Sequence, residues 1–357
     1  MKRIFLCIVF FAFIITTIYF ILHVSKVDTN LLSNIGYTKE EIKIIRSLNT
    51  NNITYIENSE YISNLTNIIQ NSNFKEENLK KYIELNSLTN LELDNIIYII
   101  NMNYEIKETY TNEIVAVMKQ EYFIEENIDR YIDYMNSIQS KYENTIELAK
   151  DVVANVNSGI DSEFYTNVEN TDTTKENLML VNKYHKLSAN YVPSNLVTVE
   201  SKYGRPLQMD KTAYEAFKKM WQVANKSGLH INVRSPYRSY DTQKSLYERY
   251  ASVDGYDEAD TYSARAGYSE HQTGLAVDVV AKDDDLGNFE NTKEFEWIKN
   301  NAHKYGFIMR YPKGKEYLTG YMYEPWHYRY VGVEVATDIY NKGITFEEYY
   351  AYYIEKK

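Results

Sequence analysis

The sequence predicts an α+β domain in its second half, preceded by a helical repeat region and one N-terminal transmembrane helix. An uncharged apolar run follows Lys2 and Arg3. A long stretch without proline or glycine then spaces Ile and Leu at three- and four-residue steps, as helices do. Beyond it, helical and strand-like patterns mix without a βαβ rhythm, which is typical of an α+β domain. The predicted parts are an anchor at 1–26, repeats at 37–157, a linker at 158–180, the α+β domain at 181–343 and a C-terminal helix at 344–357.

The N-terminal run Ile4–Leu22 is long enough to cross a hydrocarbon core, which needs about 20 helical residues. The basic residues before it predict a cytoplasmic N-terminus and an extracellular body. A cleaved signal peptide is the alternative, but the run exceeds the usual ~7–15 residues and no A-x-A site follows it. We therefore expect an uncleaved single-pass anchor in the cell membrane.

The helical region contains an internal repeat. "FKEENLKKYIEL" at Phe74 aligns with "FIEENIDRYIDY" at Phe123. A helical repeat buries its apolar stripe by stacking on a neighbour, so the two copies predict a small helical domain or stalk. Tyr82 and Tyr131, at matching positions, are expected to be core or interface residues. Chance similarity in a biased composition is the alternative, and a protein partner for the repeats is left open.

Five elements are predicted in the α+β domain. The helices are amphipathic and two of them stop at glycines, while the strands show alternation or apolar runs. They are a helix at Lys211–Gly228, a strand within Leu229–Ser239 that precedes a turn at Pro236, a helix at Tyr240–Ser252, a strand at Gly274–Ala281 and a helix at Phe295–Phe307.

The composition excludes several kinds of partner and site. The chain of 357 residues carries a formal net charge of -11, which argues against nucleic acid as a partner. Its single cysteine, Cys7, lies in the first apolar run, so an intrachain disulfide, a cysteine-based zinc site and a downstream thiol nucleophile are excluded. Metal ligands must come from His, Asp or Glu, and there are 6 histidines. We expect His185 on the surface, His230 in a strand and His303 in the last turn of a helix.

Two segments remain as candidates for a metal site, "YSEHQTGLAVDVV" and "YEPWHYRYVG". A hydrolytic zinc needs three nitrogen or oxygen ligands and one open position for water. His271, Asp278 and His327 would supply two imidazoles and a carboxylate, with a turn at Gly274 between the first two. Glu324, beside a ligand histidine but itself free, is the natural base for the water. Each short pattern taken alone often arises by chance, so their joint occurrence carries the prediction.

A third segment, "SPYRSYDTQ", places Arg238 where a strand meets a turn. A planar guanidinium matches a carboxylate, so an arginine aimed into a cleft could bind the free C-terminus of a peptide. Arg234 is the rival for this role, and a solvated surface charge is the simpler interpretation of either. Trp326 would stiffen its segment and help to exclude bulk water.

These motifs resemble those of the VanY-type D-alanyl-D-alanine carboxypeptidases. The matching patterns are S-x-H-x-x-G-x-A-x-D at Ser269–Asp278, E-x-W-H at Glu324–His327 and Y-R-S-x-x-x-Q at Tyr237–Gln243. The resemblance covers about 181–343 and implies a small antiparallel-sheet zinc peptidase fold. One departure is Pro236, where the family usually has glycine; because proline fixes φ, we expect a stiffer or differently shaped turn before Arg238.

The resemblance implies a role for each matching residue and an enzyme that removes the terminal D-alanine from peptidoglycan stem peptides. The apolar N-terminal run predicts that this enzyme is anchored in the membrane. An L,D-carboxypeptidase acting on tetrapeptide stems, a free dipeptidase, and an inactive wall-binding or scaffold protein are the alternatives. The implied roles are one Zn²⁺ per chain held by His271, Asp278 and His327, a catalytic base at Glu324, a carbonyl- or carboxylate-binding cation at Arg238, and substrate contacts at Gln243, Ser269 and Trp326.

Overall fold

The computed structural model describes residues 28–199, 206–281 and 286–355. The predicted anchor at 1–26 lies outside them. No helix within these ranges is both long and apolar enough to cross a membrane. The chain divides into two compact units, Met1–Lys119 and Gln120–Lys357, so the boundary falls inside the predicted repeat region.

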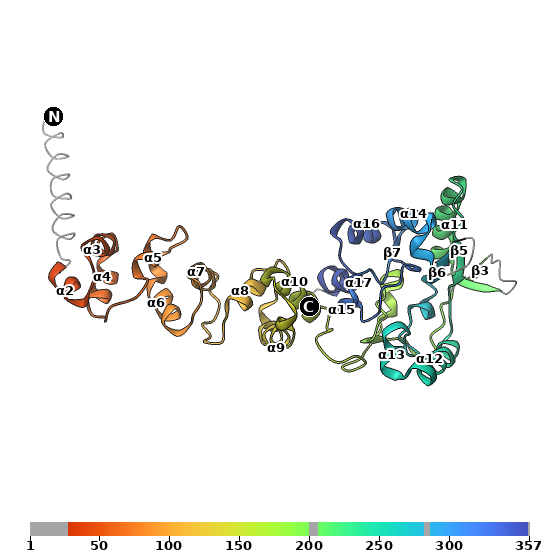
Figure 1. Ribbon diagram of the computed structural model, residues 1–357, viewed down its shortest axis with the longest axis horizontal. Helices are drawn as coiled ribbons and strands as arrows, with labels where there is room; N and C mark the ends of the chain where they lie inside the picture. Colours follow the sequence, from red (N-terminus) through yellow and green to blue (C-terminus); the bar gives the residue numbers. More distant parts are fainter. Residues whose placement is uncertain (1–27, 200–205, 282–285, 356–357) are drawn as a thin grey trace, which may run out of the picture. The chain divides into compact units, whose positions relative to one another are not determined.

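The described part of the first unit consists of short helices (Figure 1). Helices this short are marginal alone and are stabilised by packing their apolar faces together. Thr38 begins one of them with a capping box that it shares with Glu41. The helices are α2 (Thr29–Ile35), α3 (Lys39–Ile45), α4 (Thr50–Glu57), α5 (Leu65–Gln70), α6 (Leu79–Leu88), α7 (Leu93–Asn101) and α8 (Asn112–Met118).

The two repeat copies have matching hydrogen bonds around their tyrosines. The hydroxyl of Tyr82 accepts from the backbone N–H of Lys75 at 3.3 Å and donates to Oδ1 of Asn101 at 2.5 Å. The hydroxyl of Tyr131 makes the equivalent pair, 3.2 Å and 2.5 Å long, within its own copy. Both tyrosines are fully buried, which confirms their predicted core positions.

A four-stranded antiparallel sheet lies at the centre of the second unit. Its strand order is β5-β6-β8-β7, and all three neighbouring pairs are antiparallel. This confirms the predicted α+β class with a small antiparallel sheet. The strands are β5 (Asn232–Ser235), β6 (Ala276–Val280), β7 (Phe307–Met309) and β8 (His327–Tyr330); outside this sheet lie the antiparallel pair β3 (Leu196–Val199) and β4 (Leu207–Asp210) and the parallel pair β1 (Glu169–Asn170) and β2 (His185–Lys186).

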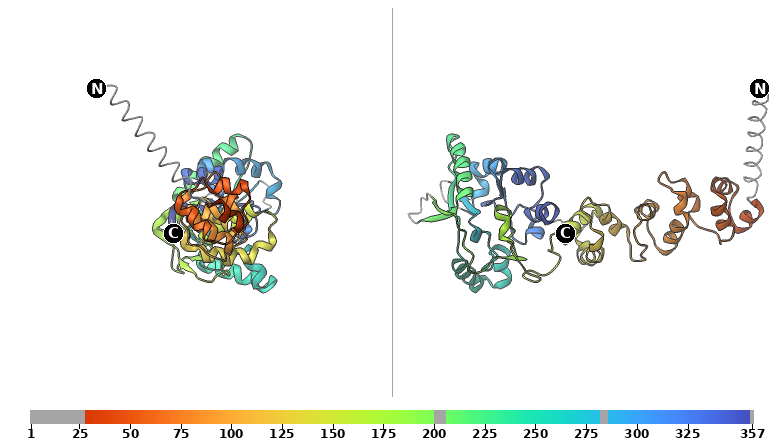
Figure 2. Two further views of the ribbon diagram at one scale, coloured as in Figure 1. Left: turned by 90° about the vertical axis from the view of Figure 1, so that its left-hand side faces the viewer. Right: turned by 180° about the vertical axis from the view of Figure 1, so that it is seen from behind.

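Helices lie on both sides of this sheet, with α11 and α14 opposite α12 and α13 in both orientations (Figures 1 and 2). The helices of the unit are α9 (Ile128–Ile138), α10 (Thr145–Asn157), α11 (Lys211–Lys226), α12 (Tyr240–Asp254), α13 (Tyr256–Tyr262), α14 (Lys293–Asn301), α15 (Glu316–Thr319), α16 (Val333–Lys342) and α17 (Phe346–Tyr349), the last continued by a π-helical turn at Tyr350–Glu355.

Two predicted elements are shorter than expected. The strand predicted within Leu229–Ser239 begins only at Asn232, and it ends at Ser235, directly before Pro236, where the turn was predicted and where no N–H is available to continue the ladder. The helix predicted at Phe295–Phe307 ends as α14 at Asn301, and a 3-10 turn, Ala302–Tyr305, completes it.

The predicted linker is a folded part of the second unit. Residues 158–180 include β1 and a 3-10 helix, Thr173–Leu178. Met179 and Leu180 are buried in the apolar core. This segment therefore contributes to the packing of the α+β domain.

Strand β6 separates the apolar core from the polar site. Val277 and Val279 belong to the core cluster that also contains Phe217 of α11 and Ile298 of α14. Since side chains alternate along a strand, Asp278 points to the opposite face. The sheet thus positions this carboxylate rigidly.

Gly274 makes the turn into β6 possible. Its φ of +71° lies in the left-handed region. A Cβ at this position would lie 2.9 Å from Leu196 Cδ2 and 3.1 Å from the backbone nitrogen of Asp210. Only glycine fits without displacing the β3–β4 hairpin.

Candidate metal centre

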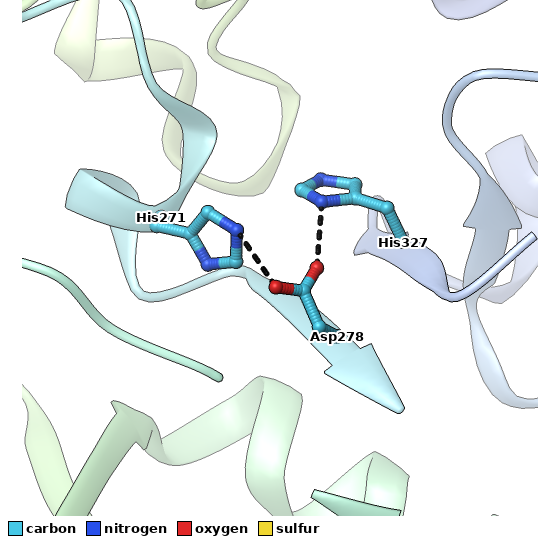
Figure 3. A group of neighbouring side chains, drawn as sticks. All are labelled: His271, Asp278 and His327. Atoms are coloured by element: carbon cyan, nitrogen blue, oxygen red, sulfur yellow. Dashed lines mark hydrogen bonds and ion pairs between the residues drawn. The ribbon is translucent and has the colours of Figure 1, made fainter. Parts of the chain in front are cut away.

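Three buried side chains from three segments converge beside the sheet (Figure 3). His271 lies in the 3-10 turn Glu270–Thr273, whose N-cap is Ser269. Asp278 lies in the middle of β6, and His327 begins β8, where the two residues are directly paired. The exposed fractions are 6% for His271, 7% for Asp278 and 3% for His327.

The potential ligand atoms of this cluster all lie within 4.8 Å of one another. Oδ1 of Asp278 is 3.0 Å from Nδ1 of His327, and its Oδ2 is 3.4 Å from Nε2 of His271. Two imidazoles and one carboxylate are a ligand set typical of catalytic zinc. The residues present therefore fit a zinc ion.

The backbone fixes which nitrogen of His271 faces the cluster. Nδ1 lies 2.7 Å from the carbonyl oxygen of Pro236. Because a carbonyl only accepts, Nδ1 must carry the proton and Nε2 presents its lone pair toward Asp278. The proline that departs from the family pattern thus anchors a predicted ligand through its carbonyl.

Burial and charge set the protonation of the cluster. Burial lowers the pKa of His271 to about 3, which leaves its imidazole neutral. Burial alone would raise the pKa of Asp278, but the two histidines and Arg238 together lower it to about 2. Burial would lower the pKa of His327, whereas its carboxylate neighbours raise it to about 9. A neutral imidazole and an ionised carboxylate are the forms that bind metal, so His271 and Asp278 are already in those forms, whereas His327 must release a proton when metal binds.

Glu324 lies beside the cluster without being one of its three members. Its Oε2 is 3.7 Å from Nδ1 of His327, and its side chain is buried. The N–H of Glu324 donates to the carbonyl of Tyr311, and its own carbonyl accepts from the N–H of His327. Burial raises the pKa of Glu324 to about 8.

Arg238 points at the same cluster. Its Nη2 lies 4.0 Å from Oδ2 of Asp278 and donates to Oγ of Ser235 at 2.8 Å. Its Nη1 donates to Oε1 of Gln243 at 2.6 Å. The Nε2 of Gln243 in turn donates to the carbonyl of Ala264 at 2.6 Å. The side-chain oxygen and nitrogen of Gln243 are thus both hydrogen-bonded within the protein, and the oxygen orients Arg238.

A cavity of about 960 Å³ opens over these residues. Arg238 and its rival Arg234 both line it, but Arg238 is the one whose ion pair with Asp278 places it at the cluster. Ser269 lines the cavity, and its Oγ also accepts from the N–H of His271 at 3.4 Å. Trp326 is half-buried in the wall.

The other described histidines stay apart from this cluster. His303 stacks on Tyr340 with ring centroids 3.8 Å apart, and His230 donates its N–H to Glu294. His185 is half-buried and groups with Glu169 and Glu355, an arrangement that is only partly shielded from solvent. The buried cluster is therefore the stronger candidate for a metal.

Sequence reasoning missed a buried ion network behind the cluster. Glu270, Arg310 and Arg329 are almost completely buried, and Oε1 of Glu270 accepts from both arginines. Arg310 is also held by Glu347 of α17. The available signal was a glutamate inside the "SEHQTG" turn, which cannot be told from a surface charge without the fold.

Comparisons with known proteins agree with this geometry. The family model "VanY: D-alanyl-D-alanine carboxypeptidase" matches residues 206–333. The chain is 39% identical over 220 residues to the putative carboxypeptidase YodJ of Bacillus subtilis (strain 168), covering 58% of this chain and 81% of YodJ. It is 37% identical over 191 residues to a D-alanyl-D-alanine carboxypeptidase of Enterococcus faecium, covering 51% of this chain and 59% of that relative.

A solved structure is similar as well. The LdcB LD-carboxypeptidase superposes with a TM-score of 0.50 at 40% sequence identity, covering 52% of this chain and 91% of LdcB. These similarities extend over most of the length of YodJ and LdcB. The chain therefore belongs to the VanY family of zinc-dependent carboxypeptidases.

Proposed function

We propose that this chain removes the terminal D-alanine from peptidoglycan stem peptides. The observation that carries the proposal is the buried convergence of two imidazoles and a carboxylate beneath a large cavity, with Glu324 beside them. The VanY family match and the enterococcal relative support D-alanyl-D-alanine as the cleaved terminus.

In this proposal His271, Asp278 and His327 hold one Zn²⁺. A catalytic zinc acts as a Lewis acid toward a carbonyl and lowers the pKa of the water it binds to ~7. The protein contributes the orientation of the three ligands, which the Pro236 carbonyl and the β6–β8 pairing fix.

Glu324 is the proposed general base. It accepts a proton from the attacking water and later delivers it to the nitrogen of the departing D-alanine. Its position within 3.7 Å of His327 puts it next to the reacting centre, and its raised pKa suits a group that must hold a proton between the two steps.

Arg238 is the proposed cation for the substrate, binding the terminal carboxylate or the carbonyl that is attacked. Gln243 orients Arg238 through its side-chain oxygen. Ser269 and Trp326, which line the cavity, are the proposed contacts for the terminal residue.

The similarity to LdcB favours a second candidate, an L,D-carboxypeptidase acting on tetrapeptide stems. The same residues would perform the chemistry on either bond. Incubating the purified enzyme separately with pentapeptide and tetrapeptide stems distinguishes the two. Release of D-alanine from the pentapeptide alone supports the main proposal, release from the tetrapeptide alone supports the second, and release from neither overturns both.

We also propose that the apolar run Ile4–Leu22 anchors the enzyme in the cell membrane, with the catalytic domain outside. The repeats at 37–157 are proposed to bind a protein partner. Fractionation of cells tests the anchor: full-length chain extracted from membranes by salt alone would contradict it. Pull-down with the repeat region deleted tests the partner, because a partner of the repeats would no longer be captured.

A further inference from the structure

Glu270 precedes the proposed ligand His271 and is 1% exposed. Its Oε1 accepts from Nε of Arg310 at 2.8 Å and from Nη1 of Arg329 at 2.7 Å. A buried carboxylate is stable only when paired and hydrogen-bonded, and these two arginines meet that need. One oxygen of Glu270 is therefore fully engaged and the carboxylate is held in a fixed orientation.

The second oxygen of Glu270 faces a proposed zinc ligand. Oε2 lies 3.6 Å from Nε2 of His327. Both atoms are buried, and neither has a hydrogen-bond partner among the described residues. The other ring nitrogen of His327, Nδ1, lies on the side of Asp278 at 3.0 Å. A shift of a few tenths of an ångström would bring Oε2 and Nε2 within hydrogen-bond distance.

We infer that Glu270 is a positioning residue for His327: it accepts the proton on Nε2 and thereby commits Nδ1 to the metal. A neutral imidazole carries one proton, so the nitrogen that donates to a carboxylate leaves the other as the ligand. This inference rests on the proposed zinc site, in which His327 is a ligand.

The network that holds Glu270 reaches beyond the segment matched by the family model. Arg310 donates through Nη1 to Oε2 of Glu347 at 2.8 Å, and its Nη2 bonds to Oε1 of the same residue. Arg329 donates through Nη2 to the carbonyl oxygens of Asn177 and Met179. Segments before and after residues 206–333 thus fix the two arginines that orient Glu270.

Replacing Glu270 by glutamine would reverse the hydrogen bond offered to His327. Guanidinium groups only donate, so the arginines would take the amide oxygen and turn the NH₂ toward Nε2. That donor would oppose a proton on Nε2 and favour the tautomer with the proton on Nδ1. Glu347→Gln is a matched control, because Glu347 is equally buried and also bonds Arg310, but its other partner is Asn182 and not His327.

The test is zinc affinity of the full-length chain, measured by competition with a chromophoric chelator. We expect Glu270→Gln to weaken zinc binding about 10–100-fold, the usual effect of removing a carboxylate that supports a ligand histidine. Glu347→Gln is expected to lower thermal stability while leaving zinc affinity close to that of wild type. Equal losses in the two variants, or no loss in Glu270→Gln, would overturn the inference.

A second measurement does not depend on either variant folding. In wild-type protein loaded with cadmium-113 and labelled with nitrogen-15 histidine, the metal–nitrogen coupling identifies the bound atom of His327. Coupling to Nδ1 supports the inference, and coupling to Nε2 overturns it. If the wild type binds no metal, or His327→Ala binds zinc as tightly as wild type, the proposed zinc site itself fails.

Discussion

Asp278 and His327 are directly paired residues of two neighbouring antiparallel strands, and their side chains meet at 3.0 Å. The ladder of β6 and β8 therefore places two proposed ligands before any metal arrives. We predict that the protein keeps its fold when zinc is removed, with a lower Tm, because a ligand that binds only the native state stabilises it by mass action.

The measurement is a thermal unfolding curve with and without chelator, followed by circular dichroism. Added zinc should raise the Tm of wild type and leave that of Asp278→Ala unchanged. A wild-type protein that is unfolded without zinc would show that the sheet does not preform the site.

Arg238→Ala should lower kcat/KM roughly 10–100-fold, since a hydrogen bond to a charged group contributes about 1.5–3 kcal/mol. Arg238→Lys should restore little, because an ammonium cannot match the bonds of the guanidinium to Ser235 and Gln243. Steady-state kinetics with a stem peptide measure both variants. Arg234→Ala is the comparison, and a larger loss there would transfer the role to Arg234.

Gly274→Ala should destabilise the protein more than Gly343→Ala. Both glycines have positive φ, which costs a residue with a Cβ about 1–2 kcal/mol. At Gly274 the new methyl group would also meet Leu196 and Asp210, whereas nothing lies within 4 Å at Gly343. Chemical denaturation gives the free energy of unfolding of each variant. Equal losses of stability would contradict this prediction, because they would mean that Leu196 and Asp210 move aside without an energetic penalty.

Lys183 should make stability rise with pH in the alkaline range. Burial lowers its pKa from 10.5 to about 8, although its ammonium donates to the carbonyl of Asp260 and lies over the ring of Phe164. Between these two values the unfolded chain binds more protons than the native state, so the free energy of unfolding increases as pH rises.

Lys183→Met lacks this proton linkage. The difference in unfolding free energy between wild type and variant should therefore shift by about 2 kcal/mol in favour of wild type from pH 8 to pH 10. Denaturant titrations at both pH values measure it. A difference that does not change with pH would contradict the lowered pKa.

The sequence was sufficient to predict the candidate site's three convergent residues and its nearby glutamate. Spacing within one turn and one strand related His271 to Asp278, and the E-x-W-H motif identified Glu324 and His327. Alternation in β6 placed Asp278 opposite the apolar core, and Gly274 marked the turn before it. The α+β class followed from the mixed patterns of the second half.

Long-range contacts between charged side chains could not be predicted in this way. Glu270, Arg310 and Glu347 are far apart in the sequence. The residue types alone do not show whether these charged side chains form a buried ion network or lie on a solvated surface. The bonding of Gln243 to Arg238 was missed for a related reason, since a side chain that orients another looks the same in sequence as one that binds substrate. By contrast, the end of β5 at Ser235 agrees with the turn predicted at Pro236.

The most direct test is the metal content of active full-length protein together with its release of D-alanine from a pentapeptide stem. We expect one zinc per chain in wild type and in Glu324→Gln, turnover in wild type alone, and loss of both zinc and turnover in the double variant His271→Ala/Asp278→Ala. Wild-type protein that releases D-alanine without any divalent metal, or Glu324→Gln that turns over normally with zinc bound, would contradict it.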